Sequence, residues 1–166
     1  AFEFATALKA PCILHSLDET DANGAIYLDS DIWVLDSLEP VAARLNSVAD
    51  CIMTPHITEP YKAANIPNED NYLTVGVFNL GFAAFSNSAS SRNFLNWWAA
   101  KKRVECAIDF KRGLFVDQTY CNLAPAYIER FDILRDPGCN LAYWNLDQRQ
   151  ITKDDLGRYF ANGAPI

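Results

Sequence analysis

Basic residues and long apolar runs are both scarce in this sequence. Its 166 residues include 14 lysines and arginines against 21 aspartates and glutamates, which gives a net charge of −7 at pH 7. A protein that binds nucleic acid through its phosphates needs the opposite sign, so we expect no nucleic-acid partner. No stretch approaches the roughly 18 apolar residues of a transmembrane helix, which predicts that no transmembrane segment is present.

Paired cysteines and a signal peptide are also lacking. The five cysteines are far apart, and none belongs to a C-x-x-C pair, so the sequence offers no zinc or redox motif. Scattered thiols in odd number are typical of a reducing compartment rather than of a disulfide scaffold. The first residues lack the basic and apolar parts of a signal peptide. We therefore expect a cytoplasmic protein.

What is present is a composition that can fold. Half of the residues are apolar, which is enough for the core of one ordinary domain. The apolar spacing predicts a helix over 2–18, broken or kinked at Pro11, and a strand over 25–28 that is buried on both faces. A capping box over 36–39 predicts the start of a second helix, and a second buried strand follows over 51–54. This strand, helix, strand order favours a parallel α/β arrangement.

The rest of the chain alternates between similar signals. A long loop is expected over 55–73, where prolines and asparagines are frequent. Further elements are expected in this order: one or two strands over 75–85, a helix over 88–103, a helix after residue 117, a strand over 131–134 and a polar hairpin or extended tail.

A pair of carboxylates is the sharpest chemical feature. Asp29 and Asp31 directly follow the strand over 25–28, and ligands of open α/β sheets bind beyond the carboxyl ends of the strands. In an extended segment, residues i and i+2 point the same way, so both carboxylates could reach one cation. Mg²⁺ and similar hard cations prefer such oxygen ligands together with substrate phosphates. The alternatives are a solvated acidic turn or a helix N-cap.

Two enzyme classes combine an apolar strand with such a pair. In haloacid-dehalogenase-like phosphatases the first aspartate is a nucleophile, and Thr or Val follows two residues after the second. This chain has Trp33 at that place, which disfavours the phosphatase. In glycosyltransferases of the GT-A type, the pair instead holds a metal ion on the diphosphate of the donor.

Three segments, in the right order, resemble glycosyltransferase family 8, which is of the GT-A type. Residues 27–32 (YLDSDI) resemble its "YLDxDI" strand end, 78–82 (FNLGF) its "FNxGf" segment, and 116–118 (VDQ) its "DQ" segment. The stretches TPH, WW, DPGCN and YWN resemble a bacterial subgroup of these enzymes, so the likeness covers nearly the whole chain. It implies an α/β fold with a GT-A-like (Rossmann-like) mixed, mainly parallel sheet flanked by helices.

The resemblance also implies roles for individual residues. Asp29 and Asp31 match the ligands of Mn²⁺ or Mg²⁺, and Asp29 matches a donor-binding position as well. Asn79 and Gly81 match the segment that lines the donor sugar. The pair at the reacting centre, which we expect to be catalytic, is Asp117 and Gln118.

Each of these assignments has a structural alternative. Asp117 is also placed to be the N-cap of the helix that follows it. Asn79 is typical of a turn or bulge residue that satisfies local backbone. His56, in the long loop, could contact the sugar or the acceptor, or it could have no functional partner. Residues 97 and 98, both tryptophans, favour a place in the core over a sugar-stacking surface.

Two parts of the family pattern are missing. A complete GT-A domain begins with a strand and helix that hold the nucleoside base, and no such pattern precedes Ala1. The family also has a metal-binding histidine near its C-terminus, whereas His15 and His56 both come too early. We therefore expect residues 1–166 to form a single, partial GT-A-like domain.

The expected activity is metal-dependent transfer of a sugar from a nucleotide-diphosphate donor, most simply a UDP-sugar, to a saccharide or related acceptor. The alternative is a catalytically inactive sugar-binding or oligomerising module. For that module the missing strand predicts an exposed sheet edge through which a homodimer could form.

Overall fold

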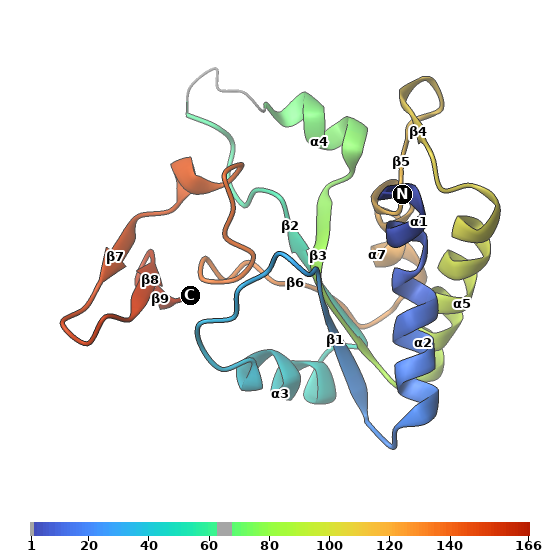
Figure 1. Cartoon of the computed structure of the whole chain (residues 1–166), viewed down its shortest axis with the longest axis horizontal. Helices are drawn as coiled ribbons and strands as arrows, with labels where there is room; N and C mark the ends of the chain where they lie inside the picture. The colour runs from blue at the N-terminus through green and yellow to red at the C-terminus, as the bar shows by residue number, and fades with distance from the viewer. Residues whose placement is uncertain (1, 63–67) are drawn as a thin grey trace.

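A mixed four-stranded sheet forms the centre of the molecule in this computed structural model, which describes residues 2–62 and 68–166 (Figure 1). Its strands are β1 (Gly24–Leu28), β2 (Cys51–Pro55), β3 (Phe78–Ser86) and β6 (Phe131–Ile133). Two smaller sheets consist of β4 (Ile108–Asp109) with β5 (Leu114–Phe115), and of β7 (Ile151–Lys153), β8 (Tyr159–Ala161) and β9 (Ala164–Pro165).

The described helices vary in length from single turns to the long α5. They are α1 (Phe2–Ala7), α2 (Lys9–Glu19), α3 (Glu39–Ser47), α4 (Glu69–Val75), α5 (Ala89–Val104), α6 (Gln118–Cys121) and α7 (Ala124–Tyr127), with 3₁₀ turns at Phe110–Arg112 and Leu146–Gln148. No helix in the described ranges is long and apolar enough to cross a lipid bilayer.

The strand order corrects one expectation. The chain is α/β as predicted, but the order β1-β3-β2-β6 pairs β3 antiparallel with both of its neighbours, and only β2 and β6 pair in parallel. The expected mainly parallel, Rossmann-like sheet is therefore not what forms. Strands β1 and β2 still run in the same direction, as the strand, helix, strand pattern requires, because β3 lies between them and opposes both.

The position of β1 corrects a second expectation. It is an edge strand of the four-stranded sheet, and all five of its residues are half-buried rather than enclosed on both faces. Its run of apolar residues reflects packing of its two faces against α2 and α3. An edge strand needs no neighbour on its outer side, so the same apolar pattern fits a partly exposed position.

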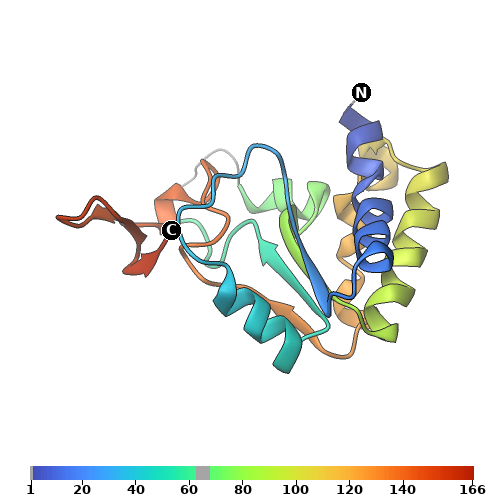
Figure 2. The same cartoon turned by 60° about the horizontal axis from the view of Figure 1, so that its bottom comes forward.

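Helices cover the two faces of the sheet unequally (Figures 1 and 2). On one face α2 and α5 pack together over a core that includes Ile13, Phe85 and Trp98. On the other face α3 contributes Val41 and Leu45 to a smaller core. The β7–β9 sheet projects away from both layers, as Figure 2 shows.

Helix boundaries differ from the sequence pattern in local ways. The break in the first helical region lies at Leu8, and Pro11 is accommodated in the first turn of α2, where its missing N–H has no helical partner to lose. The helix expected from 36–39 begins only at Glu39, without a side-chain cap. Helix α5 agrees with its prediction and is capped by Ser88.

Three further stretches refine the prediction. The long loop ends early, because α4 starts at Glu69; residues 63–67 of that loop lie outside the described residues. The helix expected after residue 117 is split into α6 and α7. The polar tail is a three-stranded antiparallel sheet rather than a single hairpin.

Candidate functional site

The buried lysine Lys9 contacts both Asp29 and Asp117, two carboxylates that are far apart in the sequence. Lys9 Nζ lies 3.1 Å from Asp29 Oδ1 and 3.2 Å from Asp117 Oδ2, and it also donates to the carbonyl of Leu80 at 3.1 Å. Lys9 and Asp117 are buried, whereas the Asp29 side chain is 35% exposed. The cluster holds two carboxylates against one ammonium and opens to solvent on the side of Asp29.

Asp29 continues the β1–β3 ladder by one residue. Its backbone N–H donates to the carbonyl of Gly81 at 2.8 Å, and its carboxylate accepts the Tyr27 hydroxyl at 2.8 Å. Burial and the neighbouring Asp29 carboxylate raise the pKa of Tyr27 far above its usual value, so this hydroxyl stays protonated as a donor. Tyr27 and Lys9 together hold the Asp29 side chain in one orientation.

Asp31 lies elsewhere. After β1 the chain turns, with the Ile32 N–H donating to the carbonyl of Asp29 at 3.0 Å, so the segment is not extended beyond the strand. The i, i+2 alignment assumed from the sequence does not hold for this pair. Asp31 is exposed, and its side chain forms no hydrogen bond or ion pair within the described part of the chain. It lines a separate apolar cavity.

Side-chain oxygen atoms gather beside Gly81 at a bulge in β3. The register between β2 and β3 shifts here, so that Thr54 pairs with Asn79. Asn79 Oδ1 accepts the Gly81 N–H at 3.0 Å, which is the local role expected of a bulge residue. A Cβ on Gly81 would lie 2.8 Å from Asn79 Oδ1 and 3.4 Å from Asp29 Oδ2. Glycine therefore keeps open the space between these two side chains.

Asn140 closes this group from a distant part of the chain. Its Nδ2 donates to Thr54 Oγ1 at 2.8 Å and to Asn79 Oδ1 at 3.0 Å. Its Oδ1 would be 3.8 Å from a Cβ on Gly81 and accepts no hydrogen bond from the described residues. The backbone of Asn140 has φ 53°, in the left-handed region that asparagine tolerates better than most residues.

His56 is buried behind Asn79. Its ring stacks on Tyr72 at 4.8 Å and meets Trp144 edge-on at 5.6 Å. Nδ1 lies 3.2 Å from the carbonyl of Val77, so Nδ1 carries the proton and Nε2 is left to accept from Asn79 Nδ2 at 3.4 Å. Burial lowers the pKa of His56 to about 4, so the ring is neutral at pH 7. It supports Asn79 from behind.

Asp117 and Gln118, the expected catalytic pair, have different surroundings: Asp117 contacts Lys9, whereas Gln118 contacts the end of α4. Asp117 is 1% exposed, and burial raises the pKa of its carboxyl group even though Lys9 opposes the shift. Its side chain makes no cap hydrogen bond to α6, so the N-cap alternative is wrong for this side chain. Gln118 Nε2 donates to the carbonyl of Val75 at the end of α4, and Gln118 forms no hydrogen bond with Asp29.

The site thus brings together Asp29, Asp117, Asn79, Gly81 and His56, whereas Asp31 and Gln118 face other neighbours. Sequence reasoning missed Lys9 and Thr54. A signal for Lys9 existed: it lies four residues before Ile13 and eight before Leu17, on the buried stripe of α2. A lysine on an apolar stripe needs a buried partner, and that requirement points to a carboxylate.

The described residues offer no ready-made metal cage. Within them, no group of three or more His, Cys, Asp or Glu side chains is placed to hold a metal ion. Asp29 and Asp31 are two carboxylates on one short turn, and Mg²⁺ often binds through one or two carboxylates with substrate phosphates completing the shell. The donor set therefore fits a cation only if a phosphate-bearing ligand is bound with it.

Comparison with known proteins gives a distant relative. The chain is 23% identical over 167 aligned residues to the uncharacterized protein YfnD of Bacillus subtilis strain 168. The match covers 99% of this chain and 51% of YfnD, so the chain spans about half the length of that relative. No protein-family profile and no solved structure matches the chain significantly.

Proposed function

We propose that this chain is the catalytic part of a metal-dependent glycosyltransferase that moves a sugar from a nucleotide-diphosphate donor, most simply a UDP-sugar, to a saccharide or related acceptor. One observation carries the proposal. Asp29, Asn79 and Asp117, each from a different family-8-like segment, gather around Gly81 and Lys9. Sugar hydroxyls need fixed donors and acceptors, and this group supplies carboxylate and amide oxygens in one place.

In this proposal Asp29 and Asp31, whose side chains face different spaces in the structure, would hold Mn²⁺ or Mg²⁺ together with the donor diphosphate only after the turn that follows β1 brings Asp31 towards Asp29. A bound cation would stabilise the negative charge on the nucleoside diphosphate as it leaves. The side chain of Asp31 is available for this, because it has no partner among the described residues. Asp29 is already held by Lys9 and Tyr27, so its orientation is fixed before any ligand arrives.

Asp117 and Lys9 act on the reacting centre. Asp117 is buried, so its carboxylate would stabilise the positive charge that develops at the anomeric carbon through its electric field rather than by direct contact, and Lys9 fixes its position. Lys9 also supplies a positive charge beside Asp29, close to the place proposed for the diphosphate. Asn79 is held by His56 and Asn140, and the Oδ1 of Asn140, which accepts no hydrogen bond from the described residues, is the amide oxygen left for a sugar beside Gly81.

Donor binding tests the proposal. Titration of UDP-glucose and UDP-galactose with and without Mn²⁺ should show metal-dependent affinity that falls at least about tenfold in Asp29→Asn and Asp31→Asn. Asp155→Asn, an exposed aspartate in the turn between β7 and β8, is the matched control and should bind like the wild type. Equal affinity in all four proteins would remove the metal site.

The edge position of β1 favours one alternative. A sugar-binding or oligomerising module without turnover could pair two copies through this free edge to form a homodimer. Size-exclusion chromatography and a UDP-sugar hydrolysis assay separate the two functions. A dimer without hydrolysis supports the module, whereas metal-dependent hydrolysis supports the transferase.

The proposed cytoplasmic location rests on the free state of all five cysteines.

A further inference from the structure

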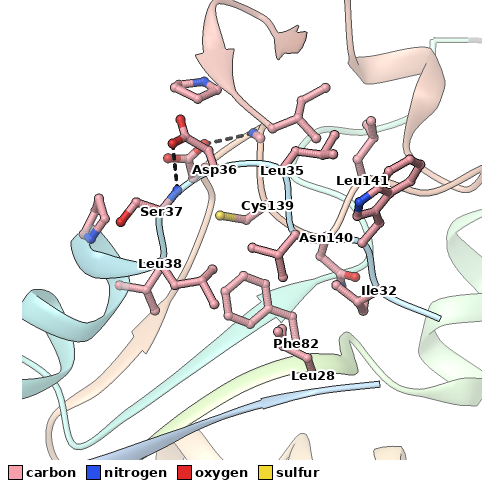
Figure 3. Close-up of a pocket in the computed structure, with 18 of the residues that line it drawn as sticks. Leu28, Ile32, Leu35, Asp36, Ser37, Leu38, Phe82, Cys139, Asn140 and Leu141 are labelled. Carbon is pink, nitrogen blue, oxygen red and sulfur yellow. Dashed lines mark hydrogen bonds between the residues drawn. The ribbon is translucent and has the colours of Figure 1, made fainter. Parts of the chain in front are cut away.

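An apolar cavity of about 430 Å³ opens beside the candidate site, on the face of the sheet that α3 covers (Figure 3). Leu28 and Phe82 form its floor, and Leu38 and Leu141 stand at its sides. Small-molecule sites typically enclose about 300–1,000 Å³ with mostly apolar walls and a few polar groups. The cavity has the size and lining of such a site, and no residue of the Lys9 cluster lines it.

The cavity and the candidate site share one wall. Asn140 lines the cavity and also donates to Asn79 beside Gly81. The turn after β1 separates the same two spaces, because Asp29 faces Lys9 whereas Asp31 lines the cavity. A molecule that lies in the cavity would therefore have one end next to the place proposed for the donor sugar.

The charge around the cavity limits what can enter it. Three carboxylates, of Asp31, Asp36 and Asp136, lie among its lining residues, and no lysine or arginine does within the described chain. The chain as a whole carries a net charge of −7. An anionic group such as a lipid phosphate would be repelled, so the lining excludes anions and leaves its apolar walls open to an uncharged apolar group.

An exposed apolar strip leads into the cavity. Trp33 is 83% exposed, and Val34 and Leu35 beside it are also exposed, although all three line the cavity. Three consecutive large apolar side chains left in water are unusual for a monomeric surface, and such patches commonly mark binding sites. A ligand that fills the cavity would cover part of this strip.

We propose that the cavity binds the neutral alkyl or aryl aglycone of a glycoside acceptor, while the acceptor sugar lies at Asn140 beside the donor. This inference rests on the proposed glycosyltransferase function for the acceptor's role, but the cavity's affinity for an apolar glycoside can be measured without any turnover. Transfer to an acceptor hydroxyl forms a glycosidic bond and breaks the bond between the anomeric carbon and the diphosphate, and the hydroxyl proton passes to the departing diphosphate.

The direct test compares octyl β-glucoside, used below its micelle concentration, with methyl β-glucoside by calorimetry. The octyl compound should bind at least about tenfold more tightly, because only it carries an apolar tail to bury. Leu35→Asp, at a 46% exposed position, should weaken octyl binding at least about fivefold and leave methyl binding unchanged. Leu156→Asp, at an 80% exposed position outside the cavity, is the matched control.

A second variant and two readouts make the outcome decisive. If Leu35→Asp does not fold, Trp33→Ala takes its place and should likewise weaken the binding of octyl glucoside. Equal binding of both glycosides, or octyl binding that survives in both cavity variants, overturns the proposal. Binding to phosphatidylcholine vesicles without binding to monomeric octyl glucoside would assign the strip to a membrane surface and also overturn it.

Turnover assays separate this inference from the proposed function. Transfer to methyl glucoside without any gain from the octyl tail contradicts the aglycone site and supports the transferase. Tight octyl binding that depends on Leu35, with no donor hydrolysis, supports the site and contradicts the transferase.

Discussion

The Lys9 ammonium lies 3.2 Å from the Asp117 carboxylate, and both side chains are buried although the two residues are far apart in the sequence. Helix α2 delivers the lysine, and the segment between β5 and α6 delivers the aspartate. A buried ion pair adds little net stability, but removal of one partner leaves the other charge buried and uncompensated. The pair therefore ties the candidate site to the packing of α2.

Replacement of Lys9 by methionine should lower the free energy of unfolding by roughly 3–5 kcal/mol, because Asp117 then lacks its partner. Urea denaturation at pH 7 measures the change. Lys101→Met, at an exposed position in the last turn of α5, is the control and should stay within about 0.5 kcal/mol of the wild type.

The double variant Lys9→Met with Asp117→Asn completes the cycle. It should be more stable than Lys9→Met alone, because the neutral amide costs less to bury than the carboxylate. If the losses of unfolding free energy from the two single substitutions simply add in the double variant, the Lys9–Asp117 pair does not hold α2 to the segment between β5 and α6.

Substitutions at Asn140 can separate the contribution of its backbone conformation to stability from that of its side-chain hydrogen bonds. Asn140→Gly keeps the φ of 53° without strain but loses the hydrogen bonds to Thr54 and Asn79, so it should cost roughly 1–3 kcal/mol. Asn140→Ala should cost about 1 kcal/mol more, because alanine disfavours the left-handed region. Denaturation of the three proteins under one set of conditions gives the order, and an alanine variant as stable as the glycine variant would contradict it.

Sequence reasoning was most successful where a signal is local. The runs that became β1, β2 and β6, and the helix α5 with its Ser88 cap, could all be predicted from spacing and capping. The order of the strands could not, because pairing joins residues far apart in the sequence. The pattern of β3 says that it is apolar, but it does not say that it lies between β1 and β2.

The same limit applies to the candidate site. The resemblance to family 8 implied that Asp29, Asn79 and Asp117 belong to one site, and in the structure they lie around Lys9 and Gly81. The prediction that Asp31 points the same way as Asp29 assumed an extended backbone, but the chain turns directly after β1. Lys9 could have been found only by asking which carboxylate a lysine on an apolar helix stripe would meet.

His56 should make the protein sensitive to mild acid. Its pKa is about 4 in the folded state and near the usual 6.5 when unfolded, so between these values the unfolded chain binds a proton that the folded chain does not. Stability from the neutral ring is therefore complete above pH ~6.5 and falls as the pH drops to ~4, by on the order of 3 kcal/mol.

Two histidine variants isolate this effect from the titration of carboxylates. His56→Gln should lose the pH dependence between 6.5 and 4, and His15→Gln should keep it, because His15 is 74% exposed. Urea midpoints for both variants at pH 7, 5.5 and 4.5 provide the comparison. Parallel curves for the two variants would show that His56 does not contribute.

Gly138 connects the stability of the C-terminal sheet with the apolar cavity. A Cβ at this position would lie only 1.7 Å from the carbonyl oxygen of Pro165, which is backbone and cannot rotate away. Pro165 and Ile166 both line the cavity, so Gly138→Ala should displace β9 and reshape that wall. We expect faster hydrogen exchange in β8 together with weaker binding of octyl glucoside.

The control for this substitution is Gly113→Ala. None of the residues that the structure describes comes within 4 Å of a Cβ at Gly113, so alanine there meets only the left-handed backbone penalty of about 1–2 kcal/mol and leaves the cavity unchanged. Because both variants add the same methyl group, a loss of octyl glucoside binding in Gly138→Ala alone must come from the movement of β9. Unchanged exchange in β8 would mean that the turn at Gly138 yields instead, and the C-terminal segment would then not shape the cavity.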